Sequence, residues 1–259
     1  MSSLFSLEGV TALITGGSRG IGQGMALELA RAGANLILVQ RDASNVDTKT
    51  KAEALGRKVD IVIADLGVAN EAYKVMEQVD KLGVEVRILL NCAGMTLRRK
   101  AEEFDDESWD KVIQVDLTSC FQLAREAGKR MLSYEIDPVI GCRGKIINIG
   151  SIMSFQGGLL TAAYASAKGG IAQLTKNMAN EWASRHVHVN CIAPGYYYTD
   201  LTASLLESER GKKIMERIPA GRWGKPSEDI GGTAVFLASR ASNYVDGAVI
   251  PVDGGWLAF

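Results

Sequence analysis

One stretch near the start of the chain decides the expected fold: Val10-Thr11-Ala12-Leu13-Ile14-Thr15-Gly16-Gly17-Ser18-Arg19-Gly20-Ile21-Gly22. Residues 10–15 are apolar and β-branched, as in a buried strand, and a glycine-rich turn and a helical pattern follow them. Glycines let the backbone approach a pyrophosphate, and the free N–H groups at the helix start favour an anion. A glycine-rich turn alone is weak evidence, because any tight strand-to-helix connection needs small residues. Its context predicts a dinucleotide site at Gly16, Ser18, Arg19, Gly20, Ile21 and Gly22.

Strand-like and helix-like segments alternate along the rest of the chain. We expect further strands at residues 36–39, 59–64, 86–90, 145–149, 186–192 and 248–252, and helices at 70–82, 108–134, 162–183 and 227–237. Such alternation implies an α/β fold of the Rossmann type, a doubly wound parallel sheet of about seven strands with helices on both faces. No linker interrupts the 259 residues. We therefore expect a single dinucleotide-binding catalytic domain over residues 1–259, with a substrate loop at about 195–225.

Composition excludes several classes of function. The net charge is −1, with 29 basic and 30 acidic residues, which gives no electrostatic footprint for nucleic acid or an anionic membrane. The four cysteines are scattered without a C-x-x-C pair, and the two histidines, expected on one face of a strand, have no neighbouring ligands. We predict no metal site. No apolar run approaches a membrane span, and the first residues lack a leader pattern, so a cytoplasmic protein is expected.

The residues that follow the predicted strands would lie at one edge of the sheet. An acidic residue after the second strand would bind the ribose 2′-hydroxyl of NAD, but Gln40-Arg41 stands there, and an arginine suits a 2′-phosphate. Arg19 would be a second clamp on that phosphate. The alternative is that Arg41 is an ordinary surface charge. NADP(H) is therefore the favoured cofactor, with NAD(H) as the alternative.

Further strand ends supply other cofactor positions. Asp65-Leu66 would lie near the adenine, although Asp65 serves equally well as a cap for the next helix. Small residues at Asn91, Ala93 and Gly94 allow close approach of a cofactor ribose.

The stretch from Ser151 to Lys168 carries the expected chemistry. Tyr164 and Lys168 are four residues apart, so on a helix the phenol and the ammonium share one face. A nearby cation stabilises a phenolate, and Ser151, at a strand end, would hold a substrate oxygen beside Tyr164. The alternative reading is a capping serine, a core tyrosine and a solvated lysine. Taken alone, the Y-x-x-x-K pattern does not exclude that alternative.

Two segments are predicted to border the substrate. The basic run Arg98-Arg99-Lys100 offers a bidentate partner for a substrate carboxylate, with a solvated charge run as the alternative. The loop after Pro194-Gly195 carries Tyr196, Tyr197 and Tyr198 and, later, Trp223, whose rings with hydroxyl groups suit an oxygenated substrate or an interface. Arg98, Met153, Tyr196 and Trp223 are the expected substrate contacts.

The chain resembles the short-chain dehydrogenase/reductase family along almost its whole length. The resemblance rests on Thr15-Gly16 with Gly20-Ile21-Gly22, on Asn91-Cys92-Ala93-Gly94, on Ser151 with Tyr164 and Lys168, and on Pro194-Gly195 with Thr199. It implies that Tyr164 is the general acid/base, that Ser151 orients the carbonyl, and that Lys168 binds the nicotinamide ribose and lowers the tyrosine pKa. Pro194, Gly195, Thr199 and the backbone near Tyr197 would hold the carboxamide. The family also implies a homotetramer.

One catalytic position departs from the family's pattern. Within the usual V-N-L, this chain has Val115-Asp116-Leu117, so Asp116 replaces the asparagine and the role of that position in a proton relay is open. The segments Ser154-Phe155-Gln156-Gly157-Gly158 and Asp253-Gly254-Gly255-Trp256 are similar to the gluconate-type branch of the family. That likeness implies hydride transfer at a secondary alcohol or ketone of a sugar acid. The alternatives are a broad carbonyl or 3-oxoacyl reductase and, from another class, a non-catalytic NADP(H)-binding regulator.

Overall fold

The computed structural model describes residues 4–199, 202–206 and 208–258. Within these residues seven strands form one sheet in the order β3-β2-β1-β4-β5-β6-β7, and every neighbouring pair is parallel. The predicted doubly wound sheet is therefore confirmed. The strands are β1 (Thr11–Thr15), β2 (Asn35–Gln40), β3 (Val59–Ile63), β4 (Val86–Asn91), β5 (Gly144–Ile149), β6 (Val187–Pro194) and β7 (Val249–Val252).

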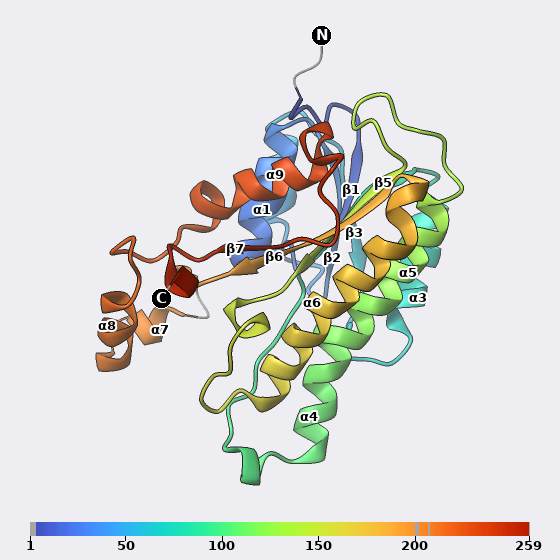
Figure 1. Ribbon diagram of the computed structural model, residues 1–259. Coiled ribbons are helices and arrows are strands. Elements are labelled where there is room, and N and C mark those ends of the chain that lie inside the picture. The colour runs from blue at the N-terminus through green and yellow to red at the C-terminus, as the bar shows by residue number, and fades with distance from the viewer. Residues whose placement is uncertain (1–3, 200–201, 207, 259) are drawn as a thin grey trace.

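Helices cover both faces of the sheet (Figure 1). Helices α1 (Gly20–Arg31), α2 (Asp47–Glu53) and α9 (Gly231–Ala238) contribute to one apolar core, and α3 (Glu71–Lys81), α5 (Ser119–Met131) and α6 (Ala162–Trp182) to the other. Side chains alternate along each strand, so Ala12 and Ile14 belong to the first core while Leu13 belongs to the second. This two-sided burial explains why the strands read as nearly continuous apolar runs.

The helix expected over residues 108–134 has an irregular centre. It consists of α4 (Asp106–Ile113), a π-helical turn over Gln114–Thr118 and α5. The Asp105 side chain caps the start of α4 by accepting the N–H of Ser108. A π-helical turn inserts one extra residue per turn and often marks a functional position. Here it carries Asp116, which is completely buried.

Several other segments differ from the sequence prediction. Helix α2 was not among the predicted helices, and the predicted substrate loop contains α7 (Ala203–Leu206) and α8 (Glu209–Glu216). Residues 200, 201 and 207 of that predicted loop lie outside the described residues. The helix predicted from residue 227 begins as a π-helical turn over Pro226–Ile230. His186 caps a short helix with a positive φ of 64°, so only His188 lies in the strand, and the prediction of two histidines on one strand face is wrong.

The carboxyl ends of the strands share one edge of the sheet. Thr15, Asn91 and Pro194 are the last residues of β1, β4 and β6, whereas Arg41 and Ser151 lie just beyond β2 and β5. The chain winds in opposite directions from β1, with β2 on one side and β4 on the other. Ligands of such sheets bind in the crevice beyond the strand ends at this switch point.

Candidate active site

The glycine-rich turn after β1 is packed too tightly for side chains. Gly16 has a positive φ of 67°, and a Cβ there would lie 2.9 Å from the backbone of Ala93. A Cβ on Gly22 would lie only 2.2 Å from the carbonyl oxygen of Gly16. Arg19 precedes α1 without a side-chain cap, so the first N–H groups of the helix remain open to an anion. This uncapped helix start fits the pyrophosphate of a dinucleotide.

The structure brings distant cofactor candidates to this turn. A Cβ on Gly20 would lie 3.5 Å from Cγ2 of Thr199, although the two residues are far apart in sequence. Ser18, Arg19, Gly20 and Thr199 together line a cavity of about 940 Å³. Ile21 packs against the apolar core beneath the turn. Thr199 is fixed by Thr202, whose hydroxyl accepts its backbone N–H at 3.0 Å.

The end of β2 carries an exposed cation on a braced loop. The buried Gln40 amide donates to the carbonyl oxygens of Asp42 and Asn45 at 2.6 and 2.7 Å. Arg41 is exposed, and among the described residues neither its guanidinium nor that of Arg19 has an ion pair or a hydrogen-bond acceptor. Two unpaired guanidinium groups on loops at the strand edge suit a 2′-phosphate.

The remaining cofactor candidates lie after β3, at Asp65 and Leu66, and at the end of β4, at Asn91. Asp65 accepts the N–H of Gly67 at 2.9 Å, so the capping role occupies one of its oxygens, and Leu66 is buried. Asn91 directs its amide into the core, where it donates to Cys120 O and to Asn148 Oδ1. The Asn91 side chain is buried there, with no partner for its Oδ1 among the described residues, so the backbone of Asn91 is the part that would face a ligand.

Thr15 fixes the loop that follows Asn91. Its hydroxyl oxygen accepts the N–H groups of Cys92 and Ala93, both at 3.0 Å. Gly94 must lack a side chain, because a Cβ there would lie 2.6 Å from Asp116 Oδ1 and 3.6 Å from Lys168 Nζ. The loop after β4 thus lies directly against the buried catalytic candidates.

Lys168 lies at the centre of the candidate catalytic group. Its side chain is buried, and Nζ donates to the carbonyl oxygen of Ile149 at 3.0 Å. Nζ lies 3.7 Å from Asp116 Oδ1 and 5.5 Å from the ring centroid of Tyr164. Burial by itself lowers the pKa of Lys168, but the charge interaction with neighbouring acidic groups, above all with Asp116, outweighs it and raises that pKa above its ordinary value. Lys168 therefore remains an ammonium.

Ser151 is held at the end of β5 by a reciprocal cap. Its Oγ accepts the N–H of Met153, and its own N–H donates to Ser154 Oγ, both at 3.2 Å. Ser154 Oγ donates in turn to the backbone oxygen of Lys168 at 2.7 Å, which ties this turn to α6. Among the described residues the Ser151 hydroxyl has no acceptor, so its proton is available to an oxygen of a ligand.

Asp116 is the most unusual member of the group. Oδ1 accepts the N–H of Met95 at 3.0 Å, whereas the buried Oδ2 has no hydrogen-bond partner among the described residues. Burial raises the pKa of this carboxyl, and the nearby Lys168 ammonium opposes that rise. The Asp116 carboxylate therefore has one oxygen in an ion pair with Lys168 and one buried oxygen without a partner among the described residues.

Aromatic rings form a wall beside the turn that holds Ser151. The ring of Tyr196 contacts those of Trp223 and Trp256 edge to face, with centroids 5.5 and 5.0 Å apart. Trp256 Nε1 donates to Gln156 Oε1 at 3.3 Å, and Met153 packs against the same cluster. The sequence analysis named Trp256 and Gln156 only as part of the gluconate-type resemblance and did not predict this contact between them. The tryptophan after the closing Asp253-Gly254-Gly255 was the available signal.

The two neighbouring arginines before α4 differ in their surroundings. The Arg99 side chain forms an ion pair with Asp105 at 3.2 Å, and the backbone N–H of Arg99 donates to the backbone oxygen of Leu160. Arg98 is exposed, and within the described part of the chain its side chain has no ion pair or hydrogen bond. Arg98 is therefore the one of this pair that is free to receive an anion.

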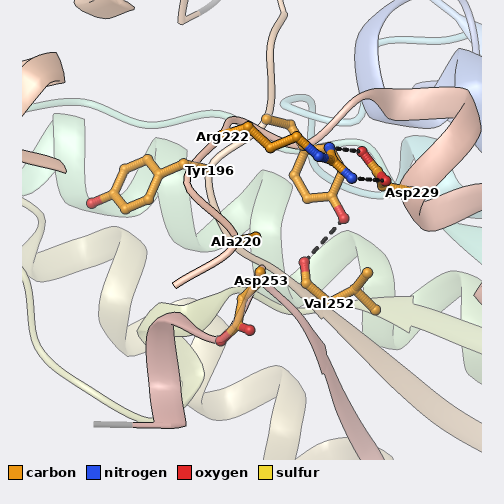
Figure 2. A pocket seen from close by; sticks show the side chains of 9 residues that line it. Tyr196, Ala220, Arg222, Asp229, Val252 and Asp253 are labelled. Atoms are coloured by element: carbon orange, nitrogen blue, oxygen red, sulfur yellow. Dashed lines mark hydrogen bonds and ion pairs between the residues drawn. The ribbon is translucent and has the colours of Figure 1, made fainter. Parts of the chain in front are cut away.

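Tyr197 has a structural role through its side chain. It is buried, its hydroxyl donates to Val252 O at 3.0 Å, and burial raises the pKa of the phenol. Beside it, Arg222 binds both carboxylate oxygens of Asp229 at 2.6 and 2.7 Å, as Figure 2 shows. These contacts surround a cavity of about 180 Å³ between the segment after Gly195 and the C-terminal strand. They leave only the backbone of Tyr197 for a carboxamide.

The doubly wound sheet, the tight glycine turn and the group of serine, tyrosine and lysine side chains define a dinucleotide-binding α/β oxidoreductase. The family described as Enoyl-(Acyl carrier protein) reductase matches residues 16–257, and the chain belongs to the short-chain dehydrogenase/reductase family. The 2-dehydro-3-deoxy-D-gluconate 5-dehydrogenase of Bacillus subtilis (strain 168) is 46% identical, with 98% of this chain and 97% of that protein covered.

Two solved structures are similar over nearly the whole chain. One is a proposed NAD(P)-dependent gluconate 5-dehydrogenase from Beutenbergia cavernae with bound NADP, which is 41% identical with a TM-score of 0.92 and covers 99% of this chain and 100% of that one. The other is a gluconate 5-dehydrogenase from Burkholderia cenocepacia J2315 in complex with NADP and tartrate, which is 33% identical with a TM-score of 0.90 and covers 99% of this chain and 98% of that one.

Proposed function

We propose that this chain is an NADP(H)-preferring dehydrogenase/reductase that interconverts a secondary alcohol and a ketone on a sugar acid of the gluconate type. The observation that carries the proposal is the group formed by Ser151, Tyr164 and Lys168 beyond the ends of β4 and β5. The names of the similar proteins support the substrate class, since gluconate or a dehydro-deoxygluconate appears in each of them.

The chemistry follows from the available protons. When bound, the cofactor donates a hydride to the ketone or accepts one from the alcohol. Ser151 donates a hydrogen bond from its free hydroxyl to the substrate oxygen and keeps its proton, whereas Tyr164 gives that oxygen the one proton needed for reduction or takes it during oxidation. Lys168 donates one N–H to Ile149 O, which leaves further N–H groups for the nicotinamide ribose and for the phenol.

The preference for NADP(H) rests on two cations. Arg19 and Arg41 are unpaired groups at the edge where the adenosine ribose would lie, and Gln40 occupies the position that an acidic residue takes in NAD-binding relatives of this fold. The backbone of Asn91, Ala93 and Gly94 would border the other ribose. NAD(H) remains the alternative cofactor if Arg41 only faces solvent.

The substrate carboxylate is assigned to Arg98. Among the described residues the Arg98 side chain is unpaired, and it adjoins Arg99, whose backbone N–H donates to Leu160 in the segment between Ser151 and Tyr164 and whose side chain already binds Asp105. The rings of Tyr196 and Trp223, with Met153, would form the wall along the sugar carbons. A broad carbonyl or 3-oxoacyl reductase is the second candidate, because the matched family is described by an acyl-carrier-protein substrate. Asp116 is the only observation that favours a non-catalytic regulator.

A single domain, a cytoplasmic location and a homotetramer belong to the same proposal. All four cysteines are free thiols, which suits a reducing compartment. Among the described residues no helix has both the length and the apolar character to cross a membrane, and no cluster of three or more metal-ligating side chains occurs. Trp109 on α4 and Phe121 on α5 are each 38% exposed, which suits an interface between copies. Light scattering of the purified chain tests the tetramer.

The proposal is tested by initial rates with NADPH and NADH against 5-keto-D-gluconate and a neutral keto-sugar of equal length. We expect NADPH to be preferred and the carboxylated substrate to have the lower KM. Arg98→Ala should raise the KM for 5-keto-D-gluconate by about 5- to 30-fold, because an exposed charge-assisted hydrogen bond to the carboxylate is lost. The KM for the neutral keto-sugar should not change. Arg99→Ala is the matched control and should change neither. Equal effects of Arg98→Ala on both substrates would count against the sugar-acid assignment.

A further inference from the structure

A buried carboxylate opposes the catalytic lysine at a position where the family's pattern has a neutral amide. Asp116 is fully buried on the π-helical turn, and its Oδ1 lies 3.7 Å from Lys168 Nζ. A neutral asparagine would leave the ammonium charge of Lys168 unopposed. The substitution therefore changes the electrostatics of the catalytic group while leaving its atoms almost in place.

The contacts of Asp116 separate its charge from its structural role. Oδ1 accepts the Met95 N–H and so fixes the loop after β4, a bond that an asparagine Oδ1 would also make. Oδ2 is buried and has no partner among the described residues, so the chain uses no hydrogen bond at the atom where the two residues differ. What distinguishes aspartate from asparagine here is the negative charge.

Few other groups compete with that charge. The titratable side chains that face the pair are Tyr164 on α6, Cys92 after β4 and Cys120 on α5. Burial raises the pKa of Cys92 to about 12 and that of Cys120 to about 11, so both thiols are neutral at ordinary pH. Lys168 and Asp116 are then the charged groups that act on the phenol of Tyr164.

We propose that Asp116 is a positioning residue that acts through Lys168: its carboxylate offsets the ammonium charge and sets the pH range in which Tyr164 exchanges its proton with the substrate. This inference rests on the proposed reaction at Tyr164. With Asp116 ionised, the phenolate beside Lys168 is less stabilised, so oxidation of an alcohol needs a higher pH than in the same enzyme with a neutral residue at 116.

The experiment compares Asp116→Asn with the wild type and with Asp110→Asn, the same chemical change at an exposed position of α4. The initial rate of gluconate oxidation with NADP⁺ is measured as a function of pH. We expect Asp116→Asn to move the midpoint of the rising limb to lower pH by about 0.5 to 1 unit, since a charge within a few ångströms typically shifts a titration by that order. Asp110→Asn should reproduce the wild-type profile. Superimposable profiles for all three proteins would overturn the inference.

A second measurement needs no substrate and separates the two proposals. The raised pKa of Asp116 means that the folded protein keeps this proton to higher pH than the unfolded chain does. Stability relative to Asp116→Asn should therefore fall as pH rises from about 4 through the folded pKa. Thermal melting of both proteins from pH 4 to 8 checks this. If the wild type turns over no substrate, the proposed function fails, and a pH-independent difference in melting temperature would overturn the charge assignment separately.

Discussion

The substitution Gly22→Ala tests whether the tight turn after β1 forms the cofactor site. The new Cβ would lie 2.2 Å from the carbonyl oxygen of Gly16, 2.9 Å from its carbonyl carbon and 3.2 Å from Cys92 Sγ. Nonbonded heavy atoms normally stay roughly 3.5 Å apart, so the turn or α1 must move by about 1 Å. The Gly16 peptide resists this movement because its N–H is bonded to Val39 O.

The cost is expected to appear in both stability and binding. Overpacking of this kind destabilises a protein by about 1 to 3 kcal/mol. Displacement of the helix N-terminus by about 1 Å should weaken NADPH binding by roughly ten- to a hundredfold, since alignment with the pyrophosphate is lost. Urea unfolding measures the first quantity, and a titration of NADPH fluorescence measures the second.

Gly232→Ala is the matched control on α9. A Cβ at Gly232 has no atom within 4 Å, so alanine should raise stability by about 0.5 to 1 kcal/mol through its helix propensity and leave NADPH binding unchanged. If Gly22→Ala bound NADPH with wild-type affinity, the assignment of the glycine-rich turn to the pyrophosphate would be refuted.

Three further predictions follow from other contacts. Tyr164→Phe should lower kcat by about 10²- to 10⁴-fold while the NADPH Kd stays within twofold; retained turnover would remove Tyr164 as the acid/base. Lys145 is buried and burial lowers its pKa to about 8, so the native state loses its proton before the unfolded chain does. Wild-type stability should then rise relative to Lys145→Met between pH 8 and about 10.5, by at most about 3 kcal/mol in urea unfolding, and a flat difference would contradict this. Asn148→Leu should cost about 2 to 4 kcal/mol in the same assay, because the buried Asn91 amide loses its acceptor and the buried Thr175 hydroxyl oxygen loses its donor; a neutral effect would show that water replaces Asn148.

The outline of the fold could be predicted because it depends on local patterns. Each expected strand corresponds to an observed one, and α1, α3 and α6 differ from the expected helices by a residue or two at either end. A continuous apolar run predicts a strand that is buried on both faces, and an apolar stripe with helical spacing predicts a helix, so both can be read from the sequence alone. The helix over 108–134 was predicted as one piece because apolar residues continue through the π-helical turn, and no proline or glycine between residues 108 and 127 marks the change. Helix α8 was missed because most of its residues are polar and few are buried, and α7 was missed because four residues are too few to show a helical period.

The candidate site divides in the same way. The sequence by itself determined which residues meet at the strand ends, because parallel strands place Thr15, Asn91 and Ser151 on one edge, and it determined that Tyr164 and Lys168 share a helix face. Only the tertiary structure decided their partners. It turned the Asn91 amide into the core, left Arg98 free while Arg99 binds Asp105, and set the Asp116 carboxylate 3.7 Å from the Lys168 ammonium. The reason is physical: periodicity fixes direction within one element, whereas a hydrogen bond or an ion pair depends on the packing of several elements.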